Sequence, residues 1–323
     1  MKQHILPDRE ADAFSAPFTR ITTGDLAVVA RLLLLGMVSW LVPVNWLWPI
    51  SRSIGRGTAF RHGSTSPTAK FVRGLHAAHG VPGAARDIHQ RYQDHVREAQ
   101  LVVLALNRPG RRWQPSVSWH GLDHLRSALE QGSGAILWVG GFAHSQIITL
   151  MALHQADFVV HQISRPEHGF STSPFGIRWL NRLWTRIERR FITERIVIVK
   201  NDAGPALQLL RQRLGANGAV WIAVGPEARR TLDVPFLGGT IRLPTGPLHL
   251  ARNSHAALLP VFTIRANDGS YDVTIERRLD VDTDITYASA ARSYVAMLEP
   301  HVTAHPDQWG GWEALIVAPT DVS

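Results

Sequence analysis

The stretch GSGAILWVGGFAHSQIIT, from Gly132 to Thr149, decides how the rest of the chain is interpreted. Its apolar run Ala135 to Val139 predicts a buried strand, the pair Gly140-Gly141 ends that strand, and His144 lies where a helix would begin. In open α/β sheets, ligands bind at the carboxyl ends of the strands, and a helix N-terminus adds amide donors and partial positive charge. His144 is therefore the first candidate for a chemical role, although a histidine after a strand is also an ordinary loop residue.

Strands and helices alternate regularly beyond this stretch. Further strands are predicted at Phe158 to Ile163, Ile196 to Val199, Ala219 to Val224, Leu258 to Ile264 and Tyr271 to Ile275. Helical patterns occupy Ile147 to Leu153, Phe175 to Arg190, Pro205 to Leu214, Thr245 to Asn253 and, last, Ala291 to Val302. This alternation predicts an α/β fold with a largely parallel central sheet and helices on both faces.

The N-terminal part of the chain has a different composition. Residues 1 to 25 form a polar tail, whereas residues 26 to 50 are apolar, rich in tryptophan and contain Arg31 as their only ionisable residue. A run close to the roughly 20 residues of a membrane helix predicts a membrane anchor, which either spans the bilayer or enters it partway. A core helix of a soluble domain is the alternative. Residues 51 to 83 look like a linker with a short helix near Phe71 to Ala78, and residues 84 to 323 are expected to form the α/β domain.

The composition of the 323 residues narrows the classes of function. With 45% hydrophobic residues the chain is expected to fold, and with no cysteine it has neither disulfides nor thiolate ligands or nucleophiles. The net charge of +8 comes mainly from arginine, which suits phosphate, carboxylate, anionic lipid or an acidic carrier protein. Arg52, Arg56 and Arg61 follow the apolar segment, so the positive-inside rule predicts that the bulk of the chain is cytoplasmic.

Three short stretches pair glycine or proline with charge at predicted strand ends. They are Ser164 to Pro166, Gly225 to Arg230, and Arg242 to Arg252. All three would surface at the sheet edge where His144 emerges, and together they describe a basic, glycine-lined pocket around one histidine. The residues expected to line this pocket are Gly141, Gly225, Thr245 and Gly246.

The order and spacing of these motifs resemble the bacterial lipid A late acyltransferases, within the lysophospholipid acyltransferase superfamily, over roughly Arg86 to Trp312. His144 matches the histidine of the family's first motif, His followed by four residues and Asp or Glu. Gly225 to Arg230 is similar to the Phe-Pro-Glu-Gly-Thr-Arg block of related enzymes. Pro306 to Trp312 resembles the Pro-Glu-Gln-Trp-x-Trp ending of the lipid A branch with one inserted glycine, and is the most specific match.

This resemblance implies a membrane-associated acyltransferase at the cytoplasmic face of a bacterial inner membrane. The enzyme would move a fatty acyl chain from a thioester, on acyl carrier protein or coenzyme A, to a hydroxyl or amine of a lipid or glycolipid. His144 would be the general base, and neither a cofactor nor a metal ion is implied. The resemblance further implies an acceptor and phosphate site formed by Arg165, Glu227, Arg229 and Arg230.

Thr149 departs from the family pattern, because it stands where the family has its carboxylate. A threonine hydroxyl can accept the same hydrogen bond from the histidine but supplies no negative charge, so the base is expected to be weaker. Another carboxylate could take the role, and Glu227 is the nearest by motif. Alternatively, the acceptor needs less activation, as an amine does, or the chain binds lipid or acyl carrier protein without catalysing transfer.

Two other functions are weaker readings of the same residues. The segment Ala143 to Ile147 looks like the Gly-x-Ser-x-Gly elbow of lipases, but both flanking glycines are missing. Nucleic-acid binding rests on the net charge alone, since the sequence offers no aromatic platform and no zinc spacing.

Overall fold

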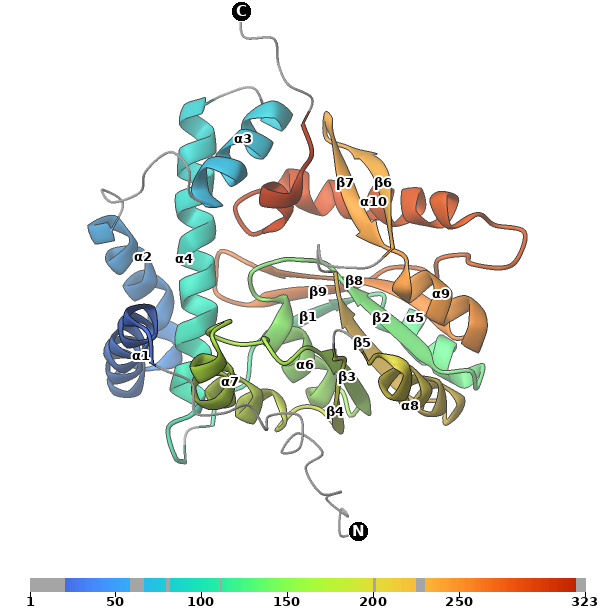
Figure 1. Cartoon of the computed structure of the whole chain (residues 1–323), viewed down its shortest axis with the longest axis horizontal. Helices are drawn as coiled ribbons and strands as arrows, with labels where there is room; N and C mark the ends of the chain where they lie inside the picture. Colours follow the sequence, from blue (N-terminus) through green and yellow to red (C-terminus); the bar gives the residue numbers. More distant parts are fainter. Residues whose placement is uncertain are drawn as a thin grey trace, which may run out of the picture.

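The computed structural model describes residues 21–58, 67–79, 82–110, 112–199, 202–224 and 230–317. Seven strands form one sheet in the order β1-β9-β8-β2-β5-β3-β4, and β6 and β7 form a separate hairpin (Figure 1). The strands of the sheet are β1 (Val117–His120), β2 (Ala135–Val139), β3 (Val160–Ser164), β4 (Glu194–Val197), β5 (Ala219–Ala223), β8 (Ala257–Arg265) and β9 (Tyr271–Ile275). The hairpin pairs β6 (Thr231–Phe236) with β7 (Gly239–Pro244).

The sheet is largely parallel, as the alternation of elements predicts. The strands β2, β3, β4, β5 and β8 all run in the same direction. Strand β9 is antiparallel to β8, and β1 is parallel to β9. The carboxyl ends of β2 and β8 therefore lie at the same edge, and β8 extends beyond the partner of Val139 to end at Arg265. This register brings Arg265 to the edge where His144 emerges.

Helices cover both faces of the sheet. On one face α5 (Leu122–Glu130) and α6 (Ser145–Gln155) pack on a core that includes Leu137, Val139 and Trp221. On the other face α8 (Gly204–Gly215), α9 (Gly246–Ser254) and α10 (Tyr287–Ala304) pack around Trp138 and Phe262. Trp138 and Trp221 thus occupy neighbouring strands but opposite faces of the sheet.

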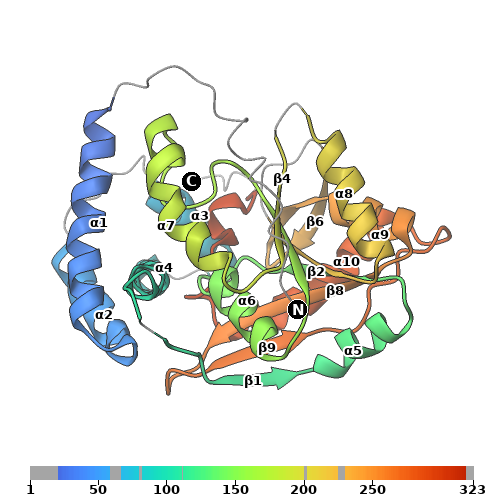
Figure 2. The ribbon, with the colours of Figure 1, turned by 90° about the horizontal axis from the view of Figure 1, so that it is seen from below.

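A long helix, α4 (Pro82–Leu106), lies beside the sheet and carries α1 (Thr23–Leu41) and α2 (Leu47–Thr58) on its far side (Figures 1 and 2). It also packs against α3 (Pro67–His79), which contacts η4 (Gly311–Ala314) on the side of the sheet, and against α7 (Asn181–Glu188). Its last turns, Leu101 to Leu106, are buried at six consecutive positions, because they share one core with side chains of α1, α6 and α7 and with Tyr271 of β9. A second core therefore joins α1, α2, α4, α6 and α7.

The apolar N-terminal segment is not one continuous helix. Thr22 caps α1 in a capping box with Asp25, α1 ends at Leu41, and Pro43 precedes a single 3-10 turn, η2 (Val44–Trp46), before α2 begins. Much of the segment expected to be a linker is helical, since α2 extends to Thr58 and α3 occupies 67–79. The short helix expected near Phe71 to Ala78 lies within α3.

Candidate functional site

His144 lies at the predicted place, directly before α6 and after the glycine pair that ends β2. Its backbone takes the N-cap position of α6, and its side chain is 1% exposed. The loop that carries it is held by the C-terminal motif: the Ala143 amide donates to the Gln308 carbonyl (2.8 Å) and the Gly310 amide donates to the Gly141 carbonyl (2.9 Å). The motif Pro306 to Trp312 therefore positions this loop.

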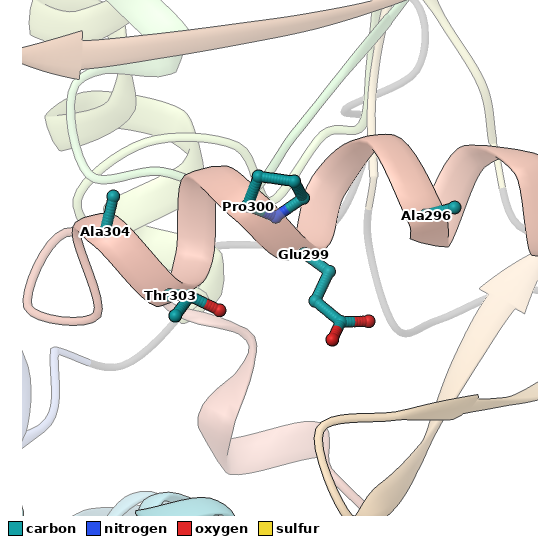
Figure 3. Close-up of a pocket in the computed structure, with 5 residues that line it drawn as sticks. All are labelled: Ala296, Glu299, Pro300, Thr303 and Ala304. Carbon is teal, nitrogen blue, oxygen red and sulfur yellow. The ribbon is translucent and has the colours of Figure 1, made fainter.

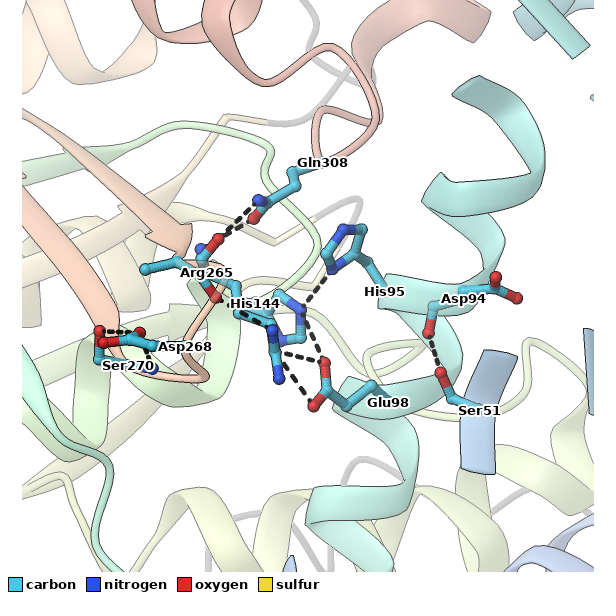
Figure 4. Close-up of polar contacts among 10 residues, drawn as sticks. Ser51, Asp94, His95, Glu98, His144, Arg265, Asp268, Ser270 and Gln308 are labelled. Atoms are coloured by element: carbon cyan, nitrogen blue, oxygen red, sulfur yellow. Dashed lines mark hydrogen bonds and ion pairs between the residues drawn. The ribbon is translucent and has the colours of Figure 1, made fainter. Parts of the chain in front are cut away.

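Glu98 on α4 supplies the carboxylate that faces His144 (Figure 4). The distance from His144 Nε2 to Glu98 Oε2 is 3.5 Å, and both side chains are at least 96% buried. Sequence reasoning missed this residue. The signal that could have revealed it is the pair of polar residues His95 and Glu98, which are three positions apart and lie among the apolar residues of the buried face of this helix.

His95 is the second polar group that faces His144. Its Nδ1 lies 3.2 Å from His144 Nε2, the same atom that faces Glu98. Burial lowers the pKa of His95 to about 3, so its Nδ1 can accept a hydrogen bond from a protonated Nε2 of His144. This tautomer leaves the lone pair on His144 Nδ1, a buried atom without a hydrogen-bond partner among the described residues.

Arg265 neutralises Glu98 from the end of β8. Its Nε lies 2.9 Å from Glu98 Oε2 and donates to Glu98 Oε1 (3.2 Å). The side chain of Gln308 bonds both backbone groups of Arg265, each at 2.8 Å. On α2, Trp48 stacks on His95 with 4.4 Å between ring centroids and lies 4.6 Å from the Arg265 guanidinium carbon. The N-terminal helices are thus in contact with the site.

The charges of this cluster follow from its burial. Burial, with smaller contributions from His95 and Arg265, keeps the pKa of His144 well below its ordinary value, so its imidazole is neutral near pH 7. Burial raises the pKa of Glu98 to about 7, although Arg265 pulls that pKa down. The protonation state of Glu98 therefore changes in the physiological range, whereas that of His144 does not.

Thr149 does not take the position of the missing carboxylate. It is fully buried on α6, and its hydroxyl lies 2.7 Å from the Thr263 hydroxyl on β8. This pair satisfies both hydroxyls between the helix and the sheet. Thr149 is a packing contact here, and the polar partners of the His144 ring come from α4.

The other residues expected from the sequence are only partly brought together. Arg165 and Arg230 are exposed, and Arg165 follows β3 directly. Gly225, Glu227 and Arg229 lie outside the described residues.

The expected pocket-lining residues are also only partly brought together. Thr245 is buried and bonds the Arg230 carbonyl through its amide and its hydroxyl, and Gly246 begins α9. Gly141 alone among the described pocket candidates lines the cavity beside His144.

That cavity has a volume of about 270 Å³ and opens at the carboxyl ends of β2 and β5. Ala143 and Ser145, the neighbours of His144, both line it, together with apolar side chains of α4 and α7. A second depression of about 540 Å³ runs along α10, where Glu299 is its only charged lining residue (Figure 3). None of the described candidate residues lines the second depression, so the chemistry belongs to the first.

The same side chains could also ligate a metal ion, since donor atoms of His95, Glu98 and His144 all lie within 4.8 Å of one another. Arg265 already compensates the charge of Glu98, so a cation would have to displace an existing partner. The arrangement is better suited to proton transfer by His144. The lipase reading lacks its base, because the Ser145 hydroxyl has no hydrogen-bond partner in the described part of the chain.

Comparisons with known proteins found a matching family model and related enzymes. The family model described as bacterial lipid A biosynthesis acyltransferase matches residues 22–312. A phosphatidylinositol mannoside acyltransferase of Mycobacterium tuberculosis is 26% identical over 198 residues, covering 58% of this chain and 56% of the relative. A phosphatidylinositol mannoside acyltransferase of Mycolicibacterium smegmatis is 25% identical over 201 residues, 58% of each chain. The matches therefore span little more than half the length of these curated relatives.

Proposed function

The chain belongs to the bacterial lipid A biosynthesis acyltransferase family, and we propose that it transfers a fatty acyl chain from a thioester to a sugar hydroxyl of a membrane glycolipid. The observation that carries this proposal is the buried pair of His144 and Glu98, with Nε2 and Oε2 3.5 Å apart. Glu98 supplies from α4 the negative charge that Thr149 lacks. A binding protein without catalysis is thereby the less favoured alternative.

In this mechanism His144 acts as general base through Nδ1. Glu98 and His95 hold the proton on Nε2, so the lone pair of Nδ1 removes the proton of the acceptor hydroxyl as its oxygen attacks the thioester carbonyl carbon. The carboxylate stabilises the resulting imidazolium. When the carbon–sulfur bond breaks, the thiolate takes the proton from His144, which restores the neutral imidazole.

The chemical class of the substrates rests on the relatives and on charge. The relatives are named for acylation of a mannosylated phosphatidylinositol, so we propose a phosphate-bearing glycolipid acceptor. Arg165, Arg229 and Arg230 are candidates to bind its phosphate, and Glu227 is a candidate for the acceptor site. The net charge of +8 suits an acidic donor carrier, either acyl carrier protein or coenzyme A.

The proposed reaction is tested by a transfer assay with purified protein, acyl thioesters of both carriers and vesicles that contain a glycosylated phosphoinositide. Wild-type protein is expected to transfer acyl chains, and His144→Ala is expected to lose about 10²- to 10⁴-fold in kcat, the usual contribution of a general base. His154→Ala is a matched control, because that histidine lies on α6 away from the cluster. Equal turnover by wild type and His144→Ala would contradict the proposal.

We further propose that α1 lies on the membrane surface and does not span it. The helix is long and apolar enough to cross a bilayer. However, Asp25 at its start bonds Ser173, Arg31 at its middle bonds Gln100 of α4, and Trp40 near its end donates to the Leu104 carbonyl (3.0 Å). A helix bonded to the folded domain along its length would carry that polar domain with it into the bilayer.

The opposite face of α1 is exposed and apolar. Its exposed side chains are Leu26, Leu33, Leu34, Met37 and Leu41, the half-exposed Trp40 lies at its border, and Trp46 follows on η2. Large exposed apolar patches mark interaction surfaces, and indoles favour the headgroup region. This face is therefore the proposed membrane contact, and location at the cytoplasmic face of the inner membrane stays a prediction.

A triple variant, Leu33→Ser with Leu34→Ser and Met37→Ser, is expected to bind preformed anionic vesicles at least about tenfold more weakly, because three exposed apolar side chains are lost. Co-sedimentation measures the binding. Val159→Ser with Leu207→Ser is the matched control, since both residues are exposed and apolar but lie away from α1. Binding lost equally in both variants, or wild-type protein that enters membranes only during synthesis, would contradict surface docking.

A further inference from the structure

Two hydrogen-bond donors that belong to side chains lining the cavity beside His144 have no partner among the described residues. They are the hydroxyl of Ser145, whose side chain is 2% exposed, and the indole N–H of Trp221, at 1%. Both residues line the cavity, Ser145 from the start of α6 and Trp221 from β5. Buried polar groups are normally paired, so two unpaired donors at one cavity indicate a ligand atom that accepts hydrogen bonds.

The start of α6 adds to this pair. The helix has 11 residues, and at its start the Ser145 amide donates to the Phe142 carbonyl and the Ile148 amide to the His144 carbonyl (3.1 Å each), while the peptide groups of the first turn point their amides toward this end. They give this end of the cavity partial positive charge. Ser145 is the first residue of α6, so its hydroxyl and the helix terminus lie on the same side of the cavity.

The other residues that line the cavity favour a ligand group that is uncharged when it binds and becomes negatively charged during the reaction. Among the described residues that line the cavity there is no carboxylate, Lys or Arg, and most of them are apolar or glycine. The other indole of the lining, Trp184, already donates to Glu188 (2.9 Å). Unpaired donors in an apolar cavity, beside a general base, suit an oxygen that becomes an anion during the reaction.

We propose that the Ser145 hydroxyl and the Trp221 indole N–H bind the carbonyl oxygen of the acyl thioester and stabilise the oxyanion formed during transfer. This inference rests on the proposed function. As the acceptor oxygen bonds the carbonyl carbon and its proton passes to His144, the π electrons of the carbonyl move to its oxygen. That oxygen is held by the two donors until the carbon–oxygen double bond re-forms and the carbon–sulfur bond breaks. The thiolate leaves with the proton from His144.

The test compares Trp221→Phe with Trp138→Phe. Each substitution deletes one buried indole N–H that has no partner, on adjacent strands, but only Trp221 lines the cavity, because Trp138 packs on Tyr294 across the sheet. Trp221→Phe is expected to lower kcat by about 10²-fold or more, as removal of one oxyanion donor does. Trp138→Phe is expected to change kcat less than about twofold, since its N–H is remote from the carbonyl.

Ser145→Ala provides a second, smaller change with the same expected direction. Both cavity variants are expected to keep the KM for the acyl donor. They are also expected to keep the pH dependence of kcat, because neither substitution changes a residue in contact with Glu98. Equal losses in Trp221→Phe and Trp138→Phe, together with no loss in Ser145→Ala, would overturn the oxyanion site.

The role of His144 is tested separately in the same assay. Loss of transfer in His144→Ala, with full activity in Trp221→Phe and Ser145→Ala, overturns only the oxyanion site. Full transfer by His144→Ala, or no transfer by wild type, overturns the proposed function and this inference with it.

Discussion

Replacing Glu98 with glutamine is expected to lower kcat by about 10²- to 10⁴-fold, close to the loss in His144→Ala. The amide keeps the size of the side chain but cannot stabilise the imidazolium of His144, whose Nε2 lies 3.5 Å from the carboxylate. The two substitutions remove one functional unit, so the double variant is expected to be hardly less active than either single variant. Steady-state assays of the four proteins measure this.

The pH dependence of kcat gives Glu98 a signature of its own. Burial raises the pKa of Glu98 to about 7, and the mechanism needs its ionised form. Activity is therefore expected to rise as the pH increases through about 7, and this rise is expected to disappear in Glu98→Gln. His144 does not produce it, because its pKa lies well below 6.5.

A second histidine–carboxylate pair supplies the matched control. His161 Nδ1 lies 3.4 Å from Glu194 Oε2, nearly the same separation, but the pair joins β3 and β4 away from the cavity. Glu194→Gln is expected to leave kcat and its pH dependence unchanged. If Glu98→Gln and Glu194→Gln behaved alike, Glu98 would not be the partner of the base.

The position of His144 could be predicted from local sequence, and the reason is physical. Five consecutive apolar residues, Ala135 to Val139, are all buried as predicted, and the glycine pair lets the chain leave the sheet before α6. The parallel sheet follows from the alternation of strands and helices along the chain. The edge at which the carboxyl ends of the strands meet follows from the common direction of those strands. These features depend on residues close together in the chain.

The partners of His144 depend instead on contacts between distant parts of the chain. Glu98 belongs to a helix whose rotation beside the sheet is set by the packing of α1, α2 and α7, so the helical pattern can place Glu98 on a buried face but not opposite His144. Thr149 occupies the position at which the family motif has its carboxylate, but its hydroxyl is hydrogen-bonded to that of Thr263 and not to His144. Arg265 directly follows the predicted strand Leu258 to Ile264 and is the last residue of β8, so its place at the sheet edge follows from local sequence, whereas its contact with Glu98 does not.

Arg265→Met is expected to have the second large effect, because it leaves Glu98 buried without its cation. Breaking a buried ion pair on one side costs about 3–5 kcal/mol of unfolding free energy. Arg265 lowers the pKa of Glu98, so its loss is expected to move the rise in activity to a pH above about 7. Urea unfolding and the pH profile of kcat measure the two effects. Arg213→Met, which breaks the more exposed pair with Glu194, is expected to cost less than about 1 kcal/mol.

The sign of the pH effect on stability distinguishes this explanation from a simple loss of packing. A carboxyl whose pKa is raised in the folded state stabilises it at low pH and loses that contribution as the pH rises through the folded pKa. Arg265→Met raises that pKa further, so its deficit in unfolding free energy is expected to grow only as the pH rises above about 7, where Glu98 ionises in the wild-type protein but not yet in the variant. Adding Glu98→Met is expected to restore stability without restoring transfer, since it removes the unpaired charge together with the partner of the base. A deficit independent of pH, which Glu98→Met fails to reduce, would mean that Arg265 acts through its contacts with Trp48 and Gln308 and not through the charge of Glu98.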